Sequence, residues 1–172
     1  MSLRIREARL EDARTIAEIH VHAWQQAYRG QLPDEHLDGL SVEERERMWR
    51  DGVSHAEPEW RCWLAEMEGR AVGFCATGLS QDADADRRTA ELFAIYLEPN
   101  VVGTGVGREL FAYAVADLQI RGFHTATLWV LETNERAKRF YELAGWKQDG
   151  ATTTERIDCL NYPTVRYRVE LA

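Results

Sequence analysis

The chain has 172 residues, of which 45% are hydrophobic, and it contains six tryptophans. This length and composition predict a single domain over residues 1–172 with a sizeable apolar core. The net charge of -8 and the pI near 5.2 argue against nucleic acid as the main partner, because binding to phosphates requires a basic surface. An acidic protein instead favours a cationic or amine substrate.

The cysteines and the N-terminus indicate where the protein works. Cys62, Cys75 and Cys159 are odd in number, widely spaced and without a C-x-x-C pair, so we expect neither disulfides nor a zinc site. Residues 1–10 do not resemble a signal peptide, and no apolar run approaches the length that spans a membrane. The sequence therefore predicts a cytoplasmic protein without a metal and without a membrane partner.

The first half of the chain predicts mixed α and β structure. Alternating apolar residues predict strands, spacings of three and four predict helices, and Ser41 with Glu44 forms a capping box. The expected elements are a strand at 3–7, a helix at 10–28, a polar helix from 41 to 50, a hairpin of strands at 60–66 and 71–79, and a further strand at 89–97. Gly30 and Pro33 interrupt the pattern between the two helices.

A glycine-rich loop follows the strand at 89–97. Residues 101–108 read V-V-G-T-G-V-G-R and lead into a helical pattern that stops at Gly122. Gly103, Gly105 and Gly107 therefore stand where a strand ends and a helix begins. Glycines there allow positive φ and let an anion approach unpaired N–H groups beside the helix dipole. The loop predicts a site for a pyrophosphate.

Two better-known phosphate-binding loops have patterns that differ from this one. A Walker A loop requires Lys followed by Ser or Thr after its last glycine, and a dinucleotide fingerprint requires G-x-G-x-x-G, whereas this loop is G-x-G-x-G. Neither pattern fits. A glycine-rich turn that only packs a helix on a sheet remains open on the loop alone.

The second half of the chain supplies the context. The stretch 128–146 closes with a pattern that resembles N-x-x-A-x-x-F-Y-x-x-x-G-[FW], and the two segments, in this order and spacing, resemble motifs A and B of the GNAT superfamily of acyl-CoA-dependent N-acetyltransferases. The residues that fill the second pattern are Asn134, Ala137, Phe140, Tyr141, Gly145 and Trp146. In the first, Gly105 and Gly107 match, while Val102 stands where Gln or Arg is usual and Thr104 where a basic residue is common.

This resemblance, over about residues 90–147, implies a fold and a cosubstrate. The implied fold is of the α/β (α+β) class: a mixed, mostly antiparallel sheet with a parallel, splayed pair formed by its fourth and fifth strands, and helices on both faces. Residues 125–131, a helix at 134–144 and strands at 146–157 and 165–171 would complete it. The resemblance also implies acetyl-CoA, held by Ile95, Tyr96, Leu97, Val102, Gly103, Thr104, Gly105, Val106, Gly107, Arg108, Asn134 and Ala137.

Two side chains are candidates for proton transfer. By resemblance, Tyr141 would protonate the departing CoA thiolate, since a phenol keeps its proton at neutral pH. Glu91 is the best local candidate for a base, because we expect it to share a strand face with Phe93, Ile95 and Leu97. Water chains are an alternative to Glu91. The backbone of residues 94–97 would bind the thioester carbonyl and the pantetheine amides.

The sequence defines less clearly the site for the amine that would accept the acetyl group. In the family it lies near the first two helices and the hairpin before the last strand, here residues 24–40 and 158–164. Trp24 and Tyr28 could line it together with Asp34, Glu35 and His36, because aromatic and acidic side chains suit a cationic amine. Polyamines, aminoglycosides, amino acids, dipeptides and peptide N-termini all remain open.

Two tempting metal sites are rejected. The acidic residues 82–86 lack the Gly and Glu of an EF-hand loop, so we expect a solvated connection between strands. His20 and His22 point to different sides of a helix.

The favoured function is acetyl transfer from acetyl-CoA to a primary amine of a small molecule or peptide by direct attack, in a possible homodimer. The alternative is a non-catalytic acyl-CoA sensor.

Overall fold

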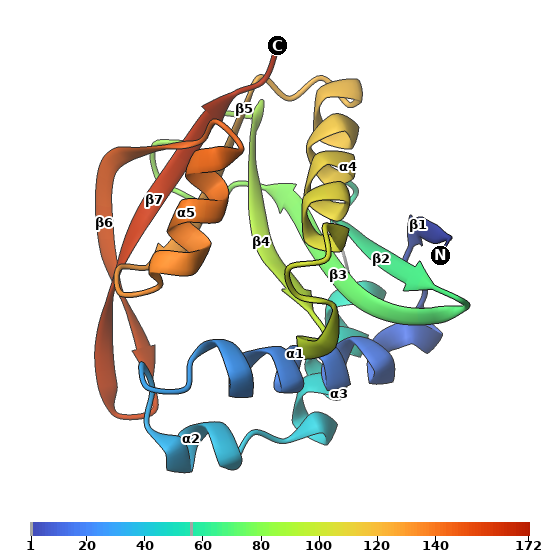
Figure 1. Cartoon of the computed structure of the whole chain (residues 1–172). Helices are drawn as coiled ribbons and strands as arrows, with labels where there is room; N and C mark the ends of the chain where they lie inside the picture. The colour runs from blue at the N-terminus through green and yellow to red at the C-terminus, as the bar shows by residue number, and fades with distance from the viewer. Residues whose placement is uncertain (1, 56) are drawn as a thin grey trace.

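The fold is built on one mixed sheet of seven strands in the order β1-β2-β3-β4-β5-β7-β6. We describe it from a computed structural model that covers residues 2–55 and 57–172. All neighbouring strands pair antiparallel except β4 and β5, which are parallel (Figure 1). The strands are β1 (Leu3–Glu7), β2 (Arg61–Met67), β3 (Arg70–Leu79), β4 (Thr89–Leu97), β5 (Thr125–Leu131), β6 (Lys147–Ile157) and β7 (Leu160–Glu170). This is the fold class expected from the sequence.

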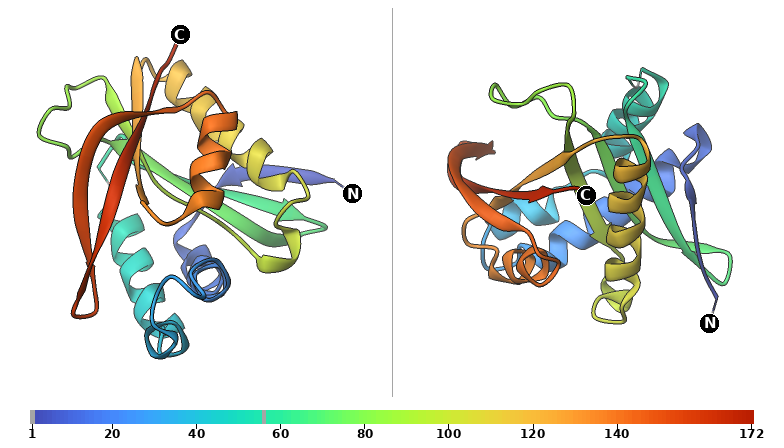
Figure 2. Two further views of the ribbon diagram at one scale, coloured as in Figure 1. Left: turned by 60° about the vertical axis from the view of Figure 1, so that its left-hand side comes forward. Right: turned by 90° about the horizontal axis from the view of Figure 1, so that it is seen from above.

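Helices cover both faces of this sheet. The helices are α1 (Ala13–Ala27), α2 (Asp34–Asp38), α3 (Val42–Ser54), α4 (Val106–Ile120) and α5 (Glu135–Leu143), and short 3₁₀ turns span Leu10–Asp12 and Pro99–Val101. Helices α4 and α5 lie on one face, while α1 and α3 lie on the other (Figure 2). None of the helices in the described part of the chain is both long and apolar enough to cross a membrane.

The two faces have separate apolar cores. Leu110, Phe111 and Leu118 of α4 pack with Tyr141 of α5 on the first face, whereas Ile16 of α1 packs with residues of α3, β2 and β3 on the second. Alternate residues of β4 divide between the two cores. Ala90, Leu92, Ile95 and Leu97 belong to the α4/α5 face, while Ala94 and Tyr96 belong to the α1/α3 face.

A one-residue bulge in β4 explains why this alternation changes parity. Ala94 pairs with Ala76 of β3, and the next pair joins Leu92 to Thr77, so Phe93 has no partner of its own on β3. Because side chains alternate with a period of two, one extra residue moves everything beyond it to the other face. Glu91, opposite Gly78, therefore shares a face with Phe93 but not with Ile95 or Leu97. The expected grouping of these four residues was wrong for the last two.

The parallel pair separates soon after it begins. Thr89, Ala90 and Glu91 of β4 pair with Thr125, Ala126 and Thr127 of β5, and the register between the two strands ends there. From Leu92 to Leu97, β4 pairs only with β3 within the described residues. The two strands thus open a gap in the middle of the sheet, which we call the β4/β5 gap.

The β6–β7 hairpin extends the sheet beyond this gap and reaches the first helices. Its tip lies near the loop between α1 and α2 (Figure 1), where His36 Nδ1 is 3.1 Å from Asp158 Oδ2. A third apolar cluster of Tyr28, Leu32, Leu37, Leu131 and Ile157 packs at the same place. The turn falls at residues 158–159 and β7 begins at Leu160, so most of the expected connection at 158–164 is strand.

Candidate active site

The glycine-rich loop ends at the N-terminus of α4, as the sequence predicts. Gly105 is the residue before the helix and has a φ of 96°, and Gly103 has a φ of 84°. A Cβ at either position would meet no heavy atom within 4 Å, so packing inside the protein does not require these glycines. Positive φ and open space in front of a helix N-terminus fit a loop that is approached by a ligand.

The free backbone donors at this terminus also suit an anion. The first helical hydrogen bond of α4 runs from the Glu109 N–H to the Gly105 carbonyl at 3.1 Å. The N–H groups of Val106, Gly107 and Arg108 therefore have no acceptor within the helix, and the helix dipole adds partial positive charge there. The exposed Arg108 adds a full charge in the first turn. The residues present fit a pyrophosphate.

Three expected ligands in the glycine-rich loop at 101–108, which we call the cradle, serve the protein itself. Thr104 turns its hydroxyl and its N–H back to the Val101 carbonyl, at 2.6 and 3.3 Å. Gly107 is buried, and a Cβ there would lie 3.0 Å from Leu97 Cδ1, so this glycine lets α4 pack closely on β4. The N–H of Val102 points to the Pro99 carbonyl at 3.4 Å. The open part of the cradle is thus formed by Gly103, Gly105 and the start of α4.

The edge of β4 along the gap offers backbone groups rather than side chains. Ile95 and Leu97 pack into the α4/α5 core, and Tyr96 packs against α1, so all three side chains leave the plane of the sheet. The backbone of residues 92–97 has β3 on one side and the β4/β5 gap on the other. Unpaired strand groups at such an edge are ready partners for the amides of an extended ligand.

Across the gap, α5 begins with the expected asparagine. Asn134 is buried, and its side-chain oxygen accepts the Ala137 N–H at 3.2 Å, which caps the helix. This bond explains the spacing of Asn134 and Ala137 in the motif, because an N-cap side chain reaches the third residue of the helix. The oxygen of Asn134 is thereby occupied, and its NH₂ group is the part left for a ligand.

Tyr141 lies in the α4/α5 core beside this gap. Its ring is 5.9 Å from Phe111, 6.5 Å from Trp146 and 6.0 Å from Tyr167, measured between centroids. Burial, with a smaller effect of nearby Tyr96 and Cys75, raises the pKa of the Tyr141 phenol above its usual value. The hydroxyl makes no hydrogen bond to any residue that the structure describes, which leaves its proton available.

Glu91 lies where β4 and β5 separate. The carboxylate is partly buried, and Ser80 Oγ donates to its Oε2 at 3.4 Å. Burial first, and then the negative charge of Asp82, raises the pKa of Glu91 to about 7. A carboxylate that titrates near neutral pH can take up and release protons at neutral pH.

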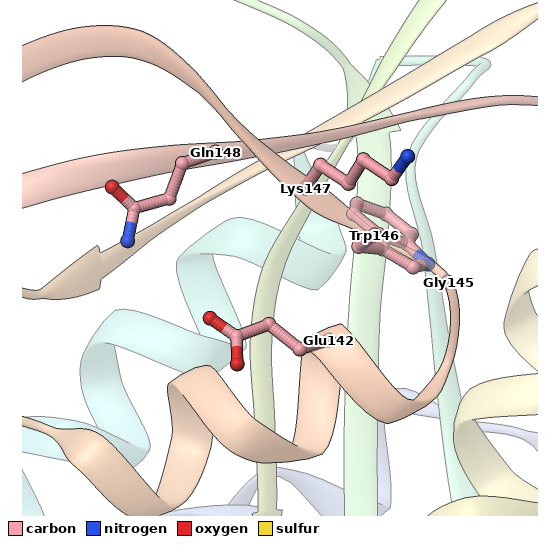
Figure 3. A pocket seen from close by; sticks show the side chains of 5 residues that line it. All are labelled: Glu142, Gly145, Trp146, Lys147 and Gln148. Carbon is pink, nitrogen blue, oxygen red and sulfur yellow. The ribbon is translucent and has the colours of Figure 1, made fainter.

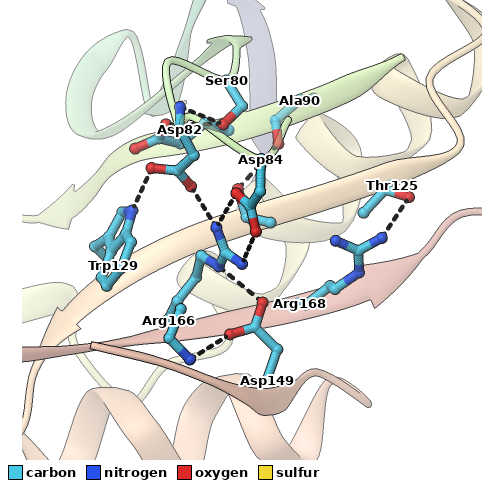
Figure 4. Close-up of polar contacts among 12 residues, drawn as sticks. Ser80, Asp82, Asp84, Ala90, Thr125, Trp129, Asp149, Arg166 and Arg168 are labelled. Carbon is cyan, nitrogen blue, oxygen red and sulfur yellow. Dashed lines mark hydrogen bonds and ion pairs between the residues drawn. The ribbon is translucent and has the colours of Figure 1, made fainter. Parts of the chain in front are cut away.

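The acidic loop between β3 and β4 differs from the expected solvated connection. Asp82 and Asp84 bind Arg166 of β7, and Asp149 of β6 binds the same guanidinium (Figure 4). Asp84 remains largely exposed, whereas Asp82 and Arg166 are shielded from solvent. The loop is therefore fastened to the sheet beside Glu91, which the acidic sequence pattern did not reveal.

The expected acceptor residues gather at the end of α1. The rings of Trp24 and Tyr28 are 4.9 Å apart, and Trp24 lies 6.4 Å from Tyr96. Arg45 of α3 already covers one face of Trp24, at 5.6 Å from its centroid. Asp34 and Glu35 are exposed, and Arg29 pairs with Asp34, so these carboxylates stand apart from the aromatic group.

Glu155 of β6 lies opposite Tyr162, which packs against the cluster that contains Tyr28, and sequence reasoning missed it. Its side chain is exposed, partial desolvation raises its pKa, and its charge acts on the phenols of Tyr28 and Tyr96. Its place depends on the hairpin pairing that sets Glu155 opposite Tyr162, so no local pattern identifies it. Together with Glu91, it makes the α1/α3 face of the site acidic as well as aromatic.

A surface pocket of about 400 Å³ lies elsewhere, at the end of α5 and the start of β6 (Figure 3). It is lined by Glu142, Gly145, Trp146, Lys147 and Gln148. None of these residues belongs to the cradle or to the gap edge of β4. Over residues 2–55 and 57–172, no three His, Cys, Asp or Glu side chains are grouped to hold a metal ion.

Comparison with known proteins agrees with this geometry. The profile described as "Acetyltransferase (GNAT) family" matches residues 21–146. The chain is 33% identical to the uncharacterized N-acetyltransferase YuaI of Bacillus subtilis, over 76% of this chain and 72% of that protein. It is 29% identical to the probable N-acetyltransferase Rv2775 of Mycobacterium tuberculosis, over 98% of this chain and 94% of that protein.

The fold is also found among solved structures. PaiA N-acetyltransferase from Thermoplasma acidophilum, crystallised in complex with coenzyme A, matches with a TM-score of 0.77 at 20% identity, over 99% of each chain. The family profile covers most of the chain, including the glycine-rich loop and the α5 motif. The chain therefore belongs to the acetyltransferase (GNAT) family and is an acetyl-CoA-dependent acetyltransferase.

Proposed function

We propose that this enzyme transfers the acetyl group of acetyl-CoA to a primary amine of a small molecule or peptide by direct attack. The observation that carries the proposal is the pair of titratable groups at the β4/β5 gap, Glu91 on one face and Tyr141 on the other. Acetyl-CoA supplies the activated acetyl group as a thioester. The protein's part is to hold it, to remove protons from the amine and to protonate the leaving sulfur.

Binding is assigned to the cradle, the β4 edge and α5. Gly103, Gly105 and the first N–H groups of α4 hold the pyrophosphate, with Arg108 adding charge. The backbone of residues 94–97 binds the pantetheine amides and donates to the thioester carbonyl, whose oxygen becomes negative during attack. The NH₂ group of Asn134 contributes from the opposite side of the gap.

Glu91 acts as the base. An ammonium cannot attack a carbonyl, so one proton must leave the amine before the C–N bond forms. Glu91, with a pKa near 7, accepts that proton and passes it to solvent. Because of the bulge between Glu91 and Ile95, Glu91 shares the face of Tyr96, which contacts Trp24.

Tyr141 acts as the acid. As the C–S bond breaks, the phenol gives its proton to sulfur, so that CoA leaves as a thiol. The proton still carried by the new amide nitrogen returns through water to the Tyr141 phenolate. The products are the acetylated amine, the CoA thiol and one proton released to solvent.

We place the acceptor among Trp24, Tyr28, Tyr96 and Glu155. Aromatic faces and carboxylates attract cations, and Glu91 adds a second acidic group on the same face. An amine with a second cationic group therefore fits better than an acidic amine.

We also propose that the protein is a single-domain cytoplasmic homodimer. Its three cysteines are unpaired, which suits a reducing compartment, and a sedimentation measurement tests the dimer.

The proposal is tested with a panel of amines incubated with acetyl-CoA, with free thiol and product mass followed together. Polyamines and basic peptides should be acetylated with higher kcat/KM than neutral amines, and acidic amines should be the poorest. The competing function is a non-catalytic sensor of acyl-CoA. It is favoured if acetyl-CoA binds while no amine in the panel gains an acetyl group.

A further inference from the structure

Arg166 of β7 is a buried guanidinium that fastens three carboxylates. Its Nη1 and Nη2 donate to Asp84 at 2.7 Å each, its Nε donates to Asp149 at 2.7 Å, and Nη1 also donates to Asp82 at 3.1 Å (Figure 4). The five N–H donors of arginine form a rigid fork, so each carboxylate is held in a defined place. Asp82 and Asp84 come from the β3–β4 loop, whereas Asp149 comes from β6.

Asp82 is held on both of its oxygens. Its Oδ1 accepts the Trp129 Nε1–H at 3.0 Å, and its Oδ2 accepts from Arg166. Trp129 and Arg166 are direct partners across β5 and β7, and the guanidinium lies 5.6 Å from the centroid of the indole. The sheet therefore presents both donors side by side, and Asp82 has little freedom to move.

A short chain of hydrogen bonds leads from Asp82 to Glu91. The Asp82 N–H donates to Ser80 Oγ at 3.2 Å, and the Ser80 hydroxyl donates to Glu91 Oε2 at 3.4 Å. Since a hydroxyl has only one proton, the Asp82 amide that occupies its acceptor side directs that proton to Glu91. The position of the loop thus determines the direction from which Glu91 is contacted.

We propose that Asp82, clamped by Arg166 and Trp129, is a positioning residue that orients Glu91 through Ser80 and makes it a stronger proton acceptor. The inference rests on the proposed function, in which Glu91 is the base. Asp82 touches neither the amine nor the thioester, and its effect passes entirely through Glu91. The Arg166 clamp is therefore part of the site rather than only a link between β7 and a surface loop.

The charges near Glu91 explain why Asp82 makes it a stronger proton acceptor. Asp82 from the loop and Arg166 from β7 are the charged groups that act on Glu91, and they have opposite effects on its pKa. The Asp82 effect is the larger, and hydrogen bonds from the Gln81 backbone and then from the Ser80 hydroxyl oppose it.

The test compares two aspartates that make the same contact. Asp82→Asn and Asp149→Asn each remove one charge from an Arg166 partner, and the two side chains are similarly shielded, at 18% and 16% exposure. The titration of Glu91 is followed by ¹³C NMR of its carboxyl carbon, assigned by the signal that Glu91→Gln removes. Asp82→Asn should lower the Glu91 midpoint by about half a unit or more. Asp149→Asn should leave it unchanged.

A third variant should shift the Glu91 midpoint in the opposite direction. Ser80→Ala removes a hydrogen bond to the charged form of Glu91, so the Glu91 midpoint should rise. The inference is overturned if Asp82→Asn and Asp149→Asn move the midpoint equally, or if neither Asp82→Asn nor Ser80→Ala moves it. Because NMR needs no acceptor, a failure of the proposed acetyl transfer leaves this result intact. Once an acceptor amine is identified, the pH at which kcat/KM falls on the acidic side of its pH profile should shift with the Glu91 midpoint in each variant.

Discussion

Glu91 and Tyr141 stand on opposite faces of the sheet, Glu91 where β4 and β5 separate and Tyr141 nearer Cys75 and Tyr96, beside the open part of the gap. Tyr141 belongs to the α4/α5 core, whereas Glu91 pairs with Gly78 and shares the other face with Phe93. The bulge at Phe93 produces this arrangement, because it moves Glu91 away from the face that carries Ile95 and Leu97. A thioester in the gap would have an acid on one side and a base on the other.

Tyr141→Phe should separate catalysis from binding. The change removes one hydroxyl and little volume, and that hydroxyl has no hydrogen bond to lose within the described structure. We expect acetyl-CoA affinity to change little and kcat to fall about 10²-fold, the usual contribution of a general acid. Steady-state kinetics and calorimetry with acetyl-CoA measure the two effects.

Tyr167→Phe is the matched control for Tyr141. Tyr167 lies 6.0 Å away in the same core, and its hydroxyl donates to Glu142 at 2.7 Å. Losing that bond should lower stability while leaving kcat near the wild-type value. A Tyr141→Phe enzyme that turns over as fast as this control would remove Tyr141 from the mechanism.

The rate should depend on pH through Glu91. The base works only when ionised, so kcat/KM should decrease as the pH falls below about 7, where Glu91 takes up its proton. Glu91→Gln should lower kcat/KM and abolish this dependence, apart from the titration of the amine itself. A profile of kcat/KM against pH, corrected for the amine pKa, provides the measurement.

Stability should respond to pH in the opposite direction. The pKa of Glu91 is raised in the folded protein from 4.5 to about 7, so the stability that its protonated form contributes is present below about pH 4.5 and is lost as the pH rises to about 7. Glu91→Gln should therefore raise Tm relative to wild type at pH 8 and have little effect near pH 4, where the carboxyl is neutral in both states. Equal effects at both pH values would contradict the burial of this charge.

The cradle is tested by Gly105→Val, with Gly150→Val as control. Both glycines have positive φ, 96° and 90°, and open space around a Cβ, so each valine should cost at least about 1–2 kcal/mol of stability. Only the change at Gly105 lies in front of α4, and only that variant should lose affinity for CoA in calorimetry. Similar losses in both variants would mean that strain alone is responsible.

Removing the buried guanidinium of Arg166 should lower the free energy of unfolding substantially. Arg166→Met leaves Asp82 and Asp149 without their shielded partner, and we expect a loss of about 3–5 kcal/mol in the free energy of unfolding. Arg168→Met removes a more exposed pair with Glu170 on the same strand and should cost at most about 1 kcal/mol. Urea unfolding at pH 7 compares them.

The sequence predicted features whose cause is local. Strand 89–97 was expected with the bounds that β4 has, because its apolar residues end at the Glu98-Pro99 turn. Asn134 was expected at the start of α5, and it caps that helix. The opposite placements of His20 and His22, buried and exposed, follow from helical periodicity alone.

Features that depend on distant pairing were missed or wrong. Nothing in the run from Glu91 to Leu97 indicates a bulge, because apolar residues stand at both odd and even positions. The contact between Asp82 and Arg166 joins residues 84 apart and requires β7 to lie beside β5. An arginine between the buried Val165 and Tyr167 was the available signal for a charged residue that needs a partner.

A crystal structure of the protein with bound CoA tests the assigned site most directly. We expect the pyrophosphate at Gly103, Gly105 and the start of α4, and the pantetheine arm along the β4 edge. The sulfur should lie in the β4/β5 gap, within hydrogen-bonding distance of the Tyr141 hydroxyl, with Glu91 on the other side of the sheet. CoA bound in the pocket between α5 and β6, or with its sulfur outside the gap, would contradict the account.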